Sequence, residues 1–391
     1  MSEVEPHLTA WHDLATRALE DNFYLSPDFI SAVLRRYVTK NRALIVFVYR
    51  IDDQVESLVA VASFSLRRSN WRMPLPVLCG MISPHGFLSH PLVDRQDASA
   101  ALQALNEWLL RPEHPWRLIF FYGISETSPF FPRLQAELTR QKVRFLSKPM
   151  FLRPMLHRHE NFNAYLAALS SARRKNFRRR WQQLQAAGSV EVILHQNLAR
   201  SVRLADDFMQ LERLGWKGMR GTALACKSAD ADFFRDLVNS NAATNRLFFV
   251  ELKLNGRSIA MTANFLCGQT LFAFKIAYDP QFQIYSPGIL AEIQTVKLFH
   301  ETAGLVKGEG GATGNSYLRS YWRDMTQMQG LYIATPHRRS QVYLLFLSAV
   351  WRIKNIFRQI THRSSKLFCA NVCFDNFYSL NETALACCQL T

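Results

Sequence analysis

Two segments of the chain share one pattern of apolar and polar positions. Residues 41–66 read NRALIVFVYRIDDQVESLVAVASFSL, and residues 245–266 read NRLFFVELKLNGRSIAMTANFL. Each is an apolar run, a polar turn and a second apolar run, which is typical of a β-hairpin. The second copy turns at Asn255-Gly256, the pair preferred in two-residue hairpin loops. Each hairpin follows a helical pattern (27–37 and 231–240), so the repeat predicts two similar α/β domains in tandem; chance similarity of two hairpins is the alternative.

The boundary between the two units is expected between Lys148 and His159. The segment KPMFLRPMLHRHE carries two prolines there and shows no periodicity. We therefore assign 1–155 to a first domain, 156–335 to a second, and 336–391 to a basic helix and tail. A helix from Asn163 to Ala187 is predicted to open the second domain, with a stop at Gly188.

A strand, a loop and a helix follow in the second unit. The apolar run 270–278 predicts the strand, and the amphipathic run 289–302 predicts the helix. Ser286 suits the N-cap, Pro287 the first helical position, and Gly288 a close approach of a ligand to the backbone. The free N–H groups at such a helix start can bind a phosphate or pyrophosphate. An ordinary helix start that binds nothing is the alternative. Residues 317–322 predict a short helix and 329–334 a last strand.

Composition narrows the class of protein. The 391 residues are 48% hydrophobic and 20% charged, which excludes a wholly disordered or collagen-like chain. The mean hydropathy is −0.09, and the lack of a run of about 18 apolar residues excludes a polytopic membrane protein. The start, MSEVEPHLTA, lacks the layout of a signal peptide. Seven scattered cysteines are typical of reduced thiols, so we expect a multi-domain protein of the cytoplasm.

The net charge of +16 lies mostly in the second unit. It amounts to +3 over residues 1–155 and +13 over residues 156–391. Six cations and no acid occur between residues 173 and 180: Arg173, Arg174, Lys175, Arg178, Arg179 and Arg180. Arginines bind phosphate through two hydrogen bonds, so we assign Arg174 and Arg178 to an anionic or phosphorylated acceptor. A solvated helix face is the alternative.

A second basic region covers residues 338–366. Its apolar and basic residues alternate with a helical spacing, and no acid occurs between Thr335 and Lys366. A basic amphipathic helix of this kind can lie on an anionic membrane surface. A terminal helix that packs on its own domain is the alternative.

No metal or nucleotide motif is found. His157 and His159 stand alone, and the cysteines lack the spacing of a zinc site. The chain has neither a Walker loop nor a dinucleotide fingerprint, so we expect no metal cofactor. The tail after Asn371 gives no interpretation.

Three strings in order carry a family resemblance: RRKNFRRRWQQLQAAG (173–188), LERLGWKGMRGTAL (211–224) and FAFKIAYDPQFQIYSPGIL (272–290). The chain resembles, over roughly residues 10–335, GNAT-superfamily acetyltransferases of the cellulose-biosynthesis (CelD-type) group, which are related to Fem-type aminoacyltransferases. The resemblance implies tandem acyl-CoA N-acyltransferase-like folds, each with a mixed α/β sheet. It also implies acetyl-CoA or another acyl-CoA as co-substrate.

The resemblance also implies where the cofactor binds. In this family the pantetheine lies along the fourth strand, which corresponds to 271–278, and the pyrophosphate caps the next helix at Ser286, Pro287 and Gly288. Backbone N–H groups beside Lys275 and Ile276 would polarise the acyl carbonyl. The chain departs from the family here, because QIYSPG replaces the usual Arg/Gln-x-x-Gly-x-Gly/Ala loop.

Catalytic residues follow from the same resemblance. Glu309 matches an acidic residue of the family, and Tyr321 or Tyr317 would donate a proton to the departing thiolate. A solvated loop acid and packing tyrosines are the alternatives. Four further residues are expected on the acceptor side: Glu212, Trp216 and Lys217 match a family motif that shapes the cleft, and Tyr278 would contact substrate. A helix end with a core Trp and a solvent-facing Lys, and a routine turn at Asp279-Pro280, are the alternatives.

The predicted function is acyl transfer from acyl-CoA to an amine or hydroxyl of a polysaccharide, cell-envelope or nucleotide-sugar precursor. A Fem-type transferase that uses aminoacyl-tRNA is one alternative, because the basic helix suits that donor. A non-catalytic accessory protein that binds an anionic polymer or a membrane is the other.

Overall fold

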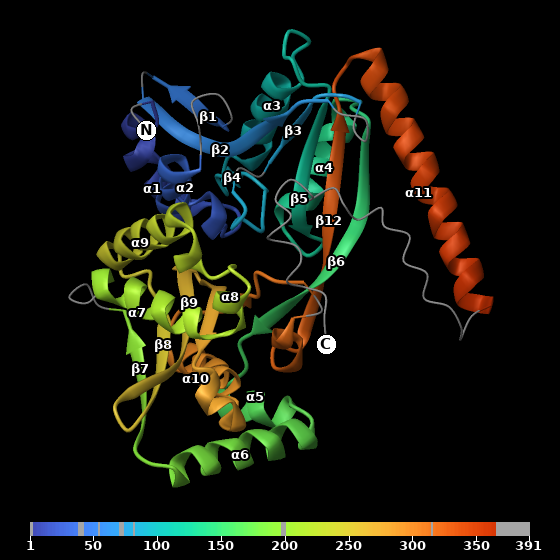
Figure 1. Cartoon of the computed structure of the whole chain (residues 1–391). Helices are drawn as coiled ribbons and strands as arrows, with labels where there is room; N and C mark the ends of the chain where they lie inside the picture. Colours follow the sequence, from blue (N-terminus) through green and yellow to red (C-terminus); the bar gives the residue numbers. More distant parts are fainter. Residues whose placement is uncertain are drawn as a thin grey trace.

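The computed structural model describes residues 3–37, 43–53, 55–69, 74–80, 83–196, 201–313 and 316–364. The tail after Asn371 and the end of the second basic region lie outside this part of the chain. The described strands form one mixed sheet flanked by helices (Figure 1). Their order is β1-β2-β3-β5-β12-β6-β11-β10-β9-β8-β7, and β4 pairs with β2.

The first half begins with two helices and a hairpin. Its elements are α1 (Leu8–Arg17), α2 (Pro27–Arg36), β1 (Ala43–Asp52), β2 (Val55–Arg67), β3 (Val77–Cys79), β4 (Leu92–Val93), α3 (Ala98–Leu109), β5 (Leu118–Ser125), α4 (Phe130–Arg140) and β6 (Phe145–His157). Ser26 caps α2 by accepting a hydrogen bond from the Phe29 N–H at 3.3 Å, and Pro27 takes the first helical position.

The second half contains α5 (Phe162–Ala168), α6 (Ser171–Ala186), β7 (Val190–His195), α7 (Ser201–Leu214), α8 (Trp216–Met219), α9 (Ser228–Ala243), β8 (Phe249–Leu254), β9 (Arg257–Cys267), β10 (Thr270–Tyr278), α10 (Pro287–Glu301), β11 (Lys307–Glu309), β12 (Asp324–Ala334) and α11 (Arg338–Ser364). Two 3₁₀ turns, η5 (Pro280–Tyr285) and η6 (Tyr317–Ser320), precede α10 and β12.

The two halves repeat one order of elements. In each, helices (α1 and α2, or α7 to α9) precede an antiparallel hairpin, β1–β2 or β8–β9. A third strand, β3 or β10, then pairs antiparallel with the hairpin and parallel with the strand that follows the next helix. Asn255 and Gly256 turn the second hairpin with φ of 51° and 77°, as the Asn-Gly pair predicts. Both predicted hairpins are confirmed, and so is the mixed α/β fold class.

The halves exchange their last strands. The final strand of the second half, β12, pairs with β5 of the first half, while β6 of the first half pairs with β11 of the second. The two exchanged strands also pair with each other along most of their length. One continuous sheet therefore joins the two repeats.

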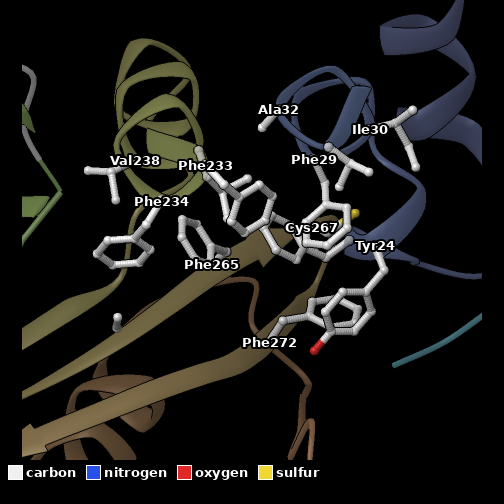
Figure 2. Packing of buried hydrophobic residues seen from close by; sticks show 14 of the residues in the cluster. Tyr24, Phe29, Ile30, Ala32, Phe233, Phe234, Val238, Phe265, Cys267 and Phe272 are labelled. Atoms are coloured by element: carbon white, nitrogen blue, oxygen red, sulfur yellow. The ribbon is translucent and has the colours of Figure 1, made fainter. Parts of the chain in front are cut away.

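Helices from both halves share one core. Phe29 of α2 packs edge-on against Phe233 of α9, with ring centroids 5.5 Å apart, and Phe23 stacks on Phe265 of β9 at 4.7 Å. Figure 2 shows Phe29, Phe233 and Phe265 meeting between α2, α9 and the strands below them. The other face of β8–β10 is covered by α10 and α5, with α6 beyond (Figure 1).

One segment without periodicity is a strand, and one expected helix is divided. The segment between Lys148 and His159 contains most of strand β6, whose Pro149 lies at a register shift against β12, where its missing N–H is tolerated. The helix expected from Asn163 to Ala187 is two helices, because Ser170 accepts a hydrogen bond from the Arg173 N–H and starts α6 anew. The division at 155 itself stays a prediction.

Candidate functional site

Strand β10 carries a bulge at its centre. Ala273 pairs with Asn264 and Lys275 pairs with Ala263, so Phe274 is the extra residue. A bulge of this kind leaves one residue unpaired and turns the local backbone out of the regular ladder. The bulge lies at the residues whose N–H groups were expected to polarise a carbonyl, Lys275 and Ile276.

Strands β10 and β11 pair only at their beginning. Residues 270–272 face residues 307–309 in parallel register, after which β11 ends and β10 continues to Tyr278. From Ala273 onwards, the β11-facing edge of β10 therefore has no strand partner in the described part of the chain. Strand pairing on the β11 side of β10 therefore ends before the bulge.

The start of α10 lies against the end of β10. A Cβ atom on Gly288 would be 3.3 Å from Cδ1 of Tyr278 and 3.4 Å from Cδ1 of Ile276. Pro287 occupies the first helical position as predicted. Ser286 is at the N-cap, but its backbone is left-handed (φ 54°, ψ 55°) and its side chain makes no capping hydrogen bond. The first-turn N–H groups, which have no partner within a helix, are therefore not capped by that hydroxyl.

A surface hollow lies beside this helix start. It is lined by Arg179, Arg180, Gln183 and Ala186 of α6 and by Ile284 and Tyr285, which directly precede Ser286. The Nε atom of Arg180 is buried and has no hydrogen-bond partner among the described residues. These two arginines were not singled out from the sequence, where Arg174 and Arg178 were assigned instead.

The two arginines assigned from the sequence differ in their surroundings. Arg174 donates hydrogen bonds from Nη1 to the carbonyl oxygens of Ala167, at 2.8 Å, and Leu169, so it holds the end of α5. Arg178 is exposed. Arg174 is thus used in hydrogen bonds within the protein, whereas the side chain of Arg178 is on the surface of α6.

A buried ion pair supports the far side of β10. The Nζ atom of Lys217 lies 2.7 Å from Oε1 of Glu212 and 3.1 Å from the carbonyl oxygen of Ile276. The other oxygen of Glu212 accepts a hydrogen bond from the Leu224 N–H at 2.8 Å. Burial alone would raise the pKa of Glu212, but the charges of Lys217 and Lys275 outweigh it and hold the pKa below its usual value. Glu212 and Lys217 are therefore brought to β10.

The other two predicted cleft residues lie close by. Trp216 opens α8 and is partly buried, with the guanidinium of Arg220 5.4 Å from its ring centroid. Tyr278 ends β10 and touches the space beside Gly288. Glu212, Lys217 and Tyr278 thus lie at the second part of β10, and the cleft role of all four residues stays a prediction.

Glu309 lies in a buried ion pair. Its Oε1 atom accepts a hydrogen bond from Nη1 of Arg153 at 2.8 Å, and the side chains are 6% and 1% exposed. Arg153 also donates to the carbonyl oxygens of Phe87, at 3.1 Å, and Ala312, at 3.4 Å. The pair joins β6, β11 and the connection before α3, so Glu309 is not a solvated loop acid.

Tyr317 and Tyr321 have different neighbours. The Tyr317 hydroxyl lies 3.4 Å from Oε2 of Glu292, whose Oε1 accepts a hydrogen bond from the Trp322 indole at 2.9 Å. Burial raises the pKa of Glu292 to about 7. Tyr321 is buried, which raises the pKa of its hydroxyl, and its carbonyl accepts from the Tyr165 hydroxyl. Glu292 was missed, although it is the single acid between Pro287 and His300.

The described residues form neither a candidate metal cluster nor a membrane-spanning helix. No cluster of three or more His, Cys, Asp or Glu side chains in that part of the chain has the arrangement of a metal site. Nor does any described helix combine the length and apolar character needed to cross a membrane.

Comparisons with known proteins agree with this geometry. Residues 171–304 match the family described as an acetyltransferase (GNAT) domain. No curated protein matches the chain. The match begins at α6 and ends just after α10, so it includes the bulge, the helix start and the hollow.

Two solved structures share the arrangement of nearly the whole chain. A structure described as FemX aligns with a TM-score of 0.58 and 10% identity, over 83% of this chain and 96% of its own. A conserved protein of unknown function from Bacteroides thetaiotaomicron VPI-5482 aligns with a TM-score of 0.53 and 13% identity, over 86% and 98%. At such identities the likeness shows the fold alone. Residues 171–304, from α6 to just past α10, are thus similar to a GNAT acetyltransferase domain.

Proposed function

We propose that the protein transfers an acyl group from acyl-CoA to an amine or hydroxyl. The acyl group that we expect is acetyl. The observation that carries the proposal is the meeting of three features: the bulge of β10, the end of its pairing with β11 at Phe272, and the start of α10 packed against its end. The pantetheine would lie along the edge of β10 beyond that pairing, and N–H groups at Lys275 and Ile276 would bind the thioester oxygen. The phosphates would bind the first turn of α10 at Ser286, Pro287 and Gly288.

The roles of the remaining residues follow from their contacts. Glu212 and Lys217 would hold the second part of β10 in place, with Trp216 and Tyr278 lining the acceptor side. Tyr321 and Tyr317 stay our two candidates for the proton donor, and the hydroxyl of Tyr317 faces the carboxyl group of Glu292. Glu309 would act by positioning, since Arg153 occupies its carboxylate.

The hollow beside α10 supports a phosphorylated ligand. Arg179 and Arg180 line it next to the residues that precede Ser286, and Arg178 is exposed on the same helix. Guanidinium groups bind phosphate oxygens in pairs. The ligand is the 3′-phosphate end of CoA or the phosphate of a nucleotide-sugar, cell-envelope or polysaccharide precursor. Because acyl-CoA is a metabolite of the cytoplasm, we place the activity there.

Replacement of Ser286 by aspartate tests the donor site. Aspartate tolerates the left-handed backbone at this position and suits a helix start, so the fold is retained. Its carboxylate would repel the pyrophosphate. We expect calorimetry to show acetyl-CoA binding weakened by about tenfold or more, since one charge contact contributes about 1–3 kcal/mol.

Two comparisons make this test specific. Pantetheine has no phosphate, so its binding should change little in the Ser286→Asp protein. Ser170→Asp places the same charge at the N-cap of α6 and should leave acetyl-CoA binding unaltered. Equal affinity of wild type and Ser286→Asp for acetyl-CoA would place the donor elsewhere.

Aminoacyl-tRNA is the second candidate donor. The exposed cations of α6 favour it, because a tRNA offers phosphates along its whole length. A wild-type protein that ignores acetyl-CoA yet binds aminoacyl-tRNA would move the function to this class. If the protein binds neither donor, the result would favour the third hypothesis, a non-catalytic accessory protein that binds an anionic polymer or a membrane.

Helix α11 is our candidate for peripheral contact with a membrane. Leu344 and Leu347 face the sheet, where they pack with Tyr332 and Phe120. The opposite face exposes Val342, Leu345, Phe346 and Ile353, and Arg338, Arg339 and Arg352 are also exposed. An apolar stripe with cations and no acid fits the interface of an anionic lipid bilayer.

A further inference from the structure

A histidine of the first half lies beside the bulge of β10. His85 belongs to the connection between β3 and α3. Its ring stacks on Phe233 of α9, with centroids 5.1 Å apart, and lies 6.2 Å from the ring of Phe274. The side chain is 14% exposed. The connection thus brings a titratable ring from the first repeat to the acyl-transfer strand of the second.

Two neighbours fix the tautomer of this ring. Its Nε2 atom lies 3.1 Å from the Tyr37 hydroxyl and 3.3 Å from Oδ1 of Asp230, and the Tyr37 hydroxyl donates to the same carboxylate oxygen at 2.5 Å. An ionised carboxylate only accepts, so Nε2 carries the proton and Nδ1 keeps its lone pair. No described residue makes a hydrogen bond to Nδ1.

The surroundings keep this ring neutral. Burial lowers the pKa of His85, and the positive charge of Lys275 on β10 acts in the same direction. The hydrogen bond to Asp230 on α9 and the charge of Glu212 on α7 oppose that shift without reversing it. Tyr37, at the end of α2, completes the set of titratable groups that face the ring. The pKa of the ring therefore lies below its usual value.

The first repeat has lost the strand length that a donor needs. Its strand β3, which corresponds to β10, spans only Val77–Cys79. The connection that follows, residues 80–97, takes the place of the short stretch 279–286 between β10 and α10. This longer connection is what reaches the second repeat, because Arg153 and the Phe87 carbonyl hold it next to Glu309.

We propose that His85 Nδ1 is the general base for the acceptor, and that Asp230 and Tyr37 are its positioning residues. The inference rests on the proposed acyl transfer. The acceptor nitrogen or oxygen attacks the thioester carbonyl carbon, so that a new bond to carbon forms and the C–S bond breaks. The proton leaves the acceptor for Nδ1, and the proposed tyrosine donor (Tyr321 or Tyr317) protonates the departing thiolate. The ring and the tyrosinate then return to their neutral forms by exchanging a proton through solvent.

His85→Gln tests the base without removing the contact. The glutamine amide can still donate to Asp230, but it has no basic atom in place of Nδ1. With acetyl-CoA and a panel of primary amines, we expect thiol release to slow by about 100-fold or more. Thermal unfolding and acetyl-CoA affinity should match the wild type. His157→Gln is the matched control, because His157 also pairs with an aspartate, Asp324 at 2.9 Å, but is exposed and distant.

The pH profile separates catalysis from packing. In the wild type, kcat/KM should fall in acid with an apparent pKa below 6.5, and this limb should be absent in His85→Gln. Asp230→Asn should lower kcat more than it changes KM, because the amide can donate to Nε2 and drive the proton to Nδ1.

Three results overturn the assignment or its premise. A His85→Gln protein that keeps both the rate and the acid limb overturns the base. A proton on Nδ1 at neutral pH, seen by ¹⁵N NMR of histidine-labelled protein, overturns it independently of any donor. A wild type that does not bind acetyl-CoA contradicts the proposed function instead, and the two failures are thus distinct.

Discussion

At the scale of single residues, the interactions that matter here join positions far apart in the sequence. Glu309 pairs with Arg153, and His85 pairs with Asp230, across separations of 156 and 145 residues. No local pattern predicts such pairs, because periodicity reports only which residues share a face of one element. Ser286, Pro287 and Gly288 were recognisable, since the start of a helix is a local feature. The left-handed backbone of Ser286 was not.

Glu292 gives a prediction about pH and stability. Its pKa in the folded protein, about 7, lies above the ordinary value of 4.5. Folding therefore favours the protonated form, so the stabilisation is complete below about pH 4.5 and is lost as the pH rises through 7. We expect Glu292→Gln to be more stable than the wild type at pH 8, by on the order of 2 kcal/mol, and similar to it at pH 4.

Urea denaturation at the two pH values measures this effect. The amide can still accept from Trp322 and donate to Tyr317, so the contacts of the side chain are preserved. Glu301→Gln, at an exposed acid of the same helix, should show no such change with pH. A Glu292→Gln protein less stable than the wild type at pH 8 would mean that the carboxylate is stabilised when charged.

At the scale of elements, apolar runs predicted the strands of the second repeat well. β10 has the bounds that its run indicates, because a buried strand between polar turns leaves little choice of length. β6 was missed, because two prolines usually end a strand. Its proline at the register shift needs no ladder hydrogen bond, and only the partner strand shows that. Local sequence rules thus predict an element well where its pairing with neighbouring strands is regular.

Helix α11 gives a prediction at this scale. Replacement of Leu345 and Phe346 by glutamine removes two apolar side chains from the exposed stripe and should leave the packed face intact. We expect the full chain to bind phosphatidylserine-containing vesicles, and the double variant to bind about tenfold or more weakly, since each apolar side chain contributes about 1.5–3 kcal/mol when buried.

A vesicle sedimentation assay provides the comparison. Ile51→Gln with Val55→Gln removes two equally exposed apolar side chains from the β1–β2 hairpin and should leave binding unchanged. Vesicles of neutral lipid and high salt should both weaken wild-type binding. Equal binding by all three proteins would show that α11 is not the contact.

At the scale of the whole molecule, the repeat was predictable but its interlocking was not. Two similar hairpins indicate two similar units, yet nothing in the apolar runs says that β5 pairs with β12 rather than with β6. The choice between those partners depends on the tertiary arrangement, which also supplies the shared core of α2 and α9. The sequence therefore indicated two domains, whereas the sheet joins them.

The exchange predicts how fragments behave. A fragment of residues 1–160 would expose the edges of both β5 and β6, which β12 covers in the full chain. We expect it to aggregate or to remain unfolded, and to become soluble when residues 161–364 are produced with it. Size-exclusion chromatography of the separate and co-expressed fragments measures this. A monomeric, cooperatively folding 1–160 fragment would contradict the prediction.

The position of β12 near the end of the described chain also sets an order of events during synthesis. A ribosome releases the first repeat long before it makes residues 324–334, so β5 emerges without its neighbour. The nascent chain must keep that edge from pairing wrongly until residues 324–334 have been translated. Because β12 completes the sheet of the first repeat, that repeat can finish folding only late in translation.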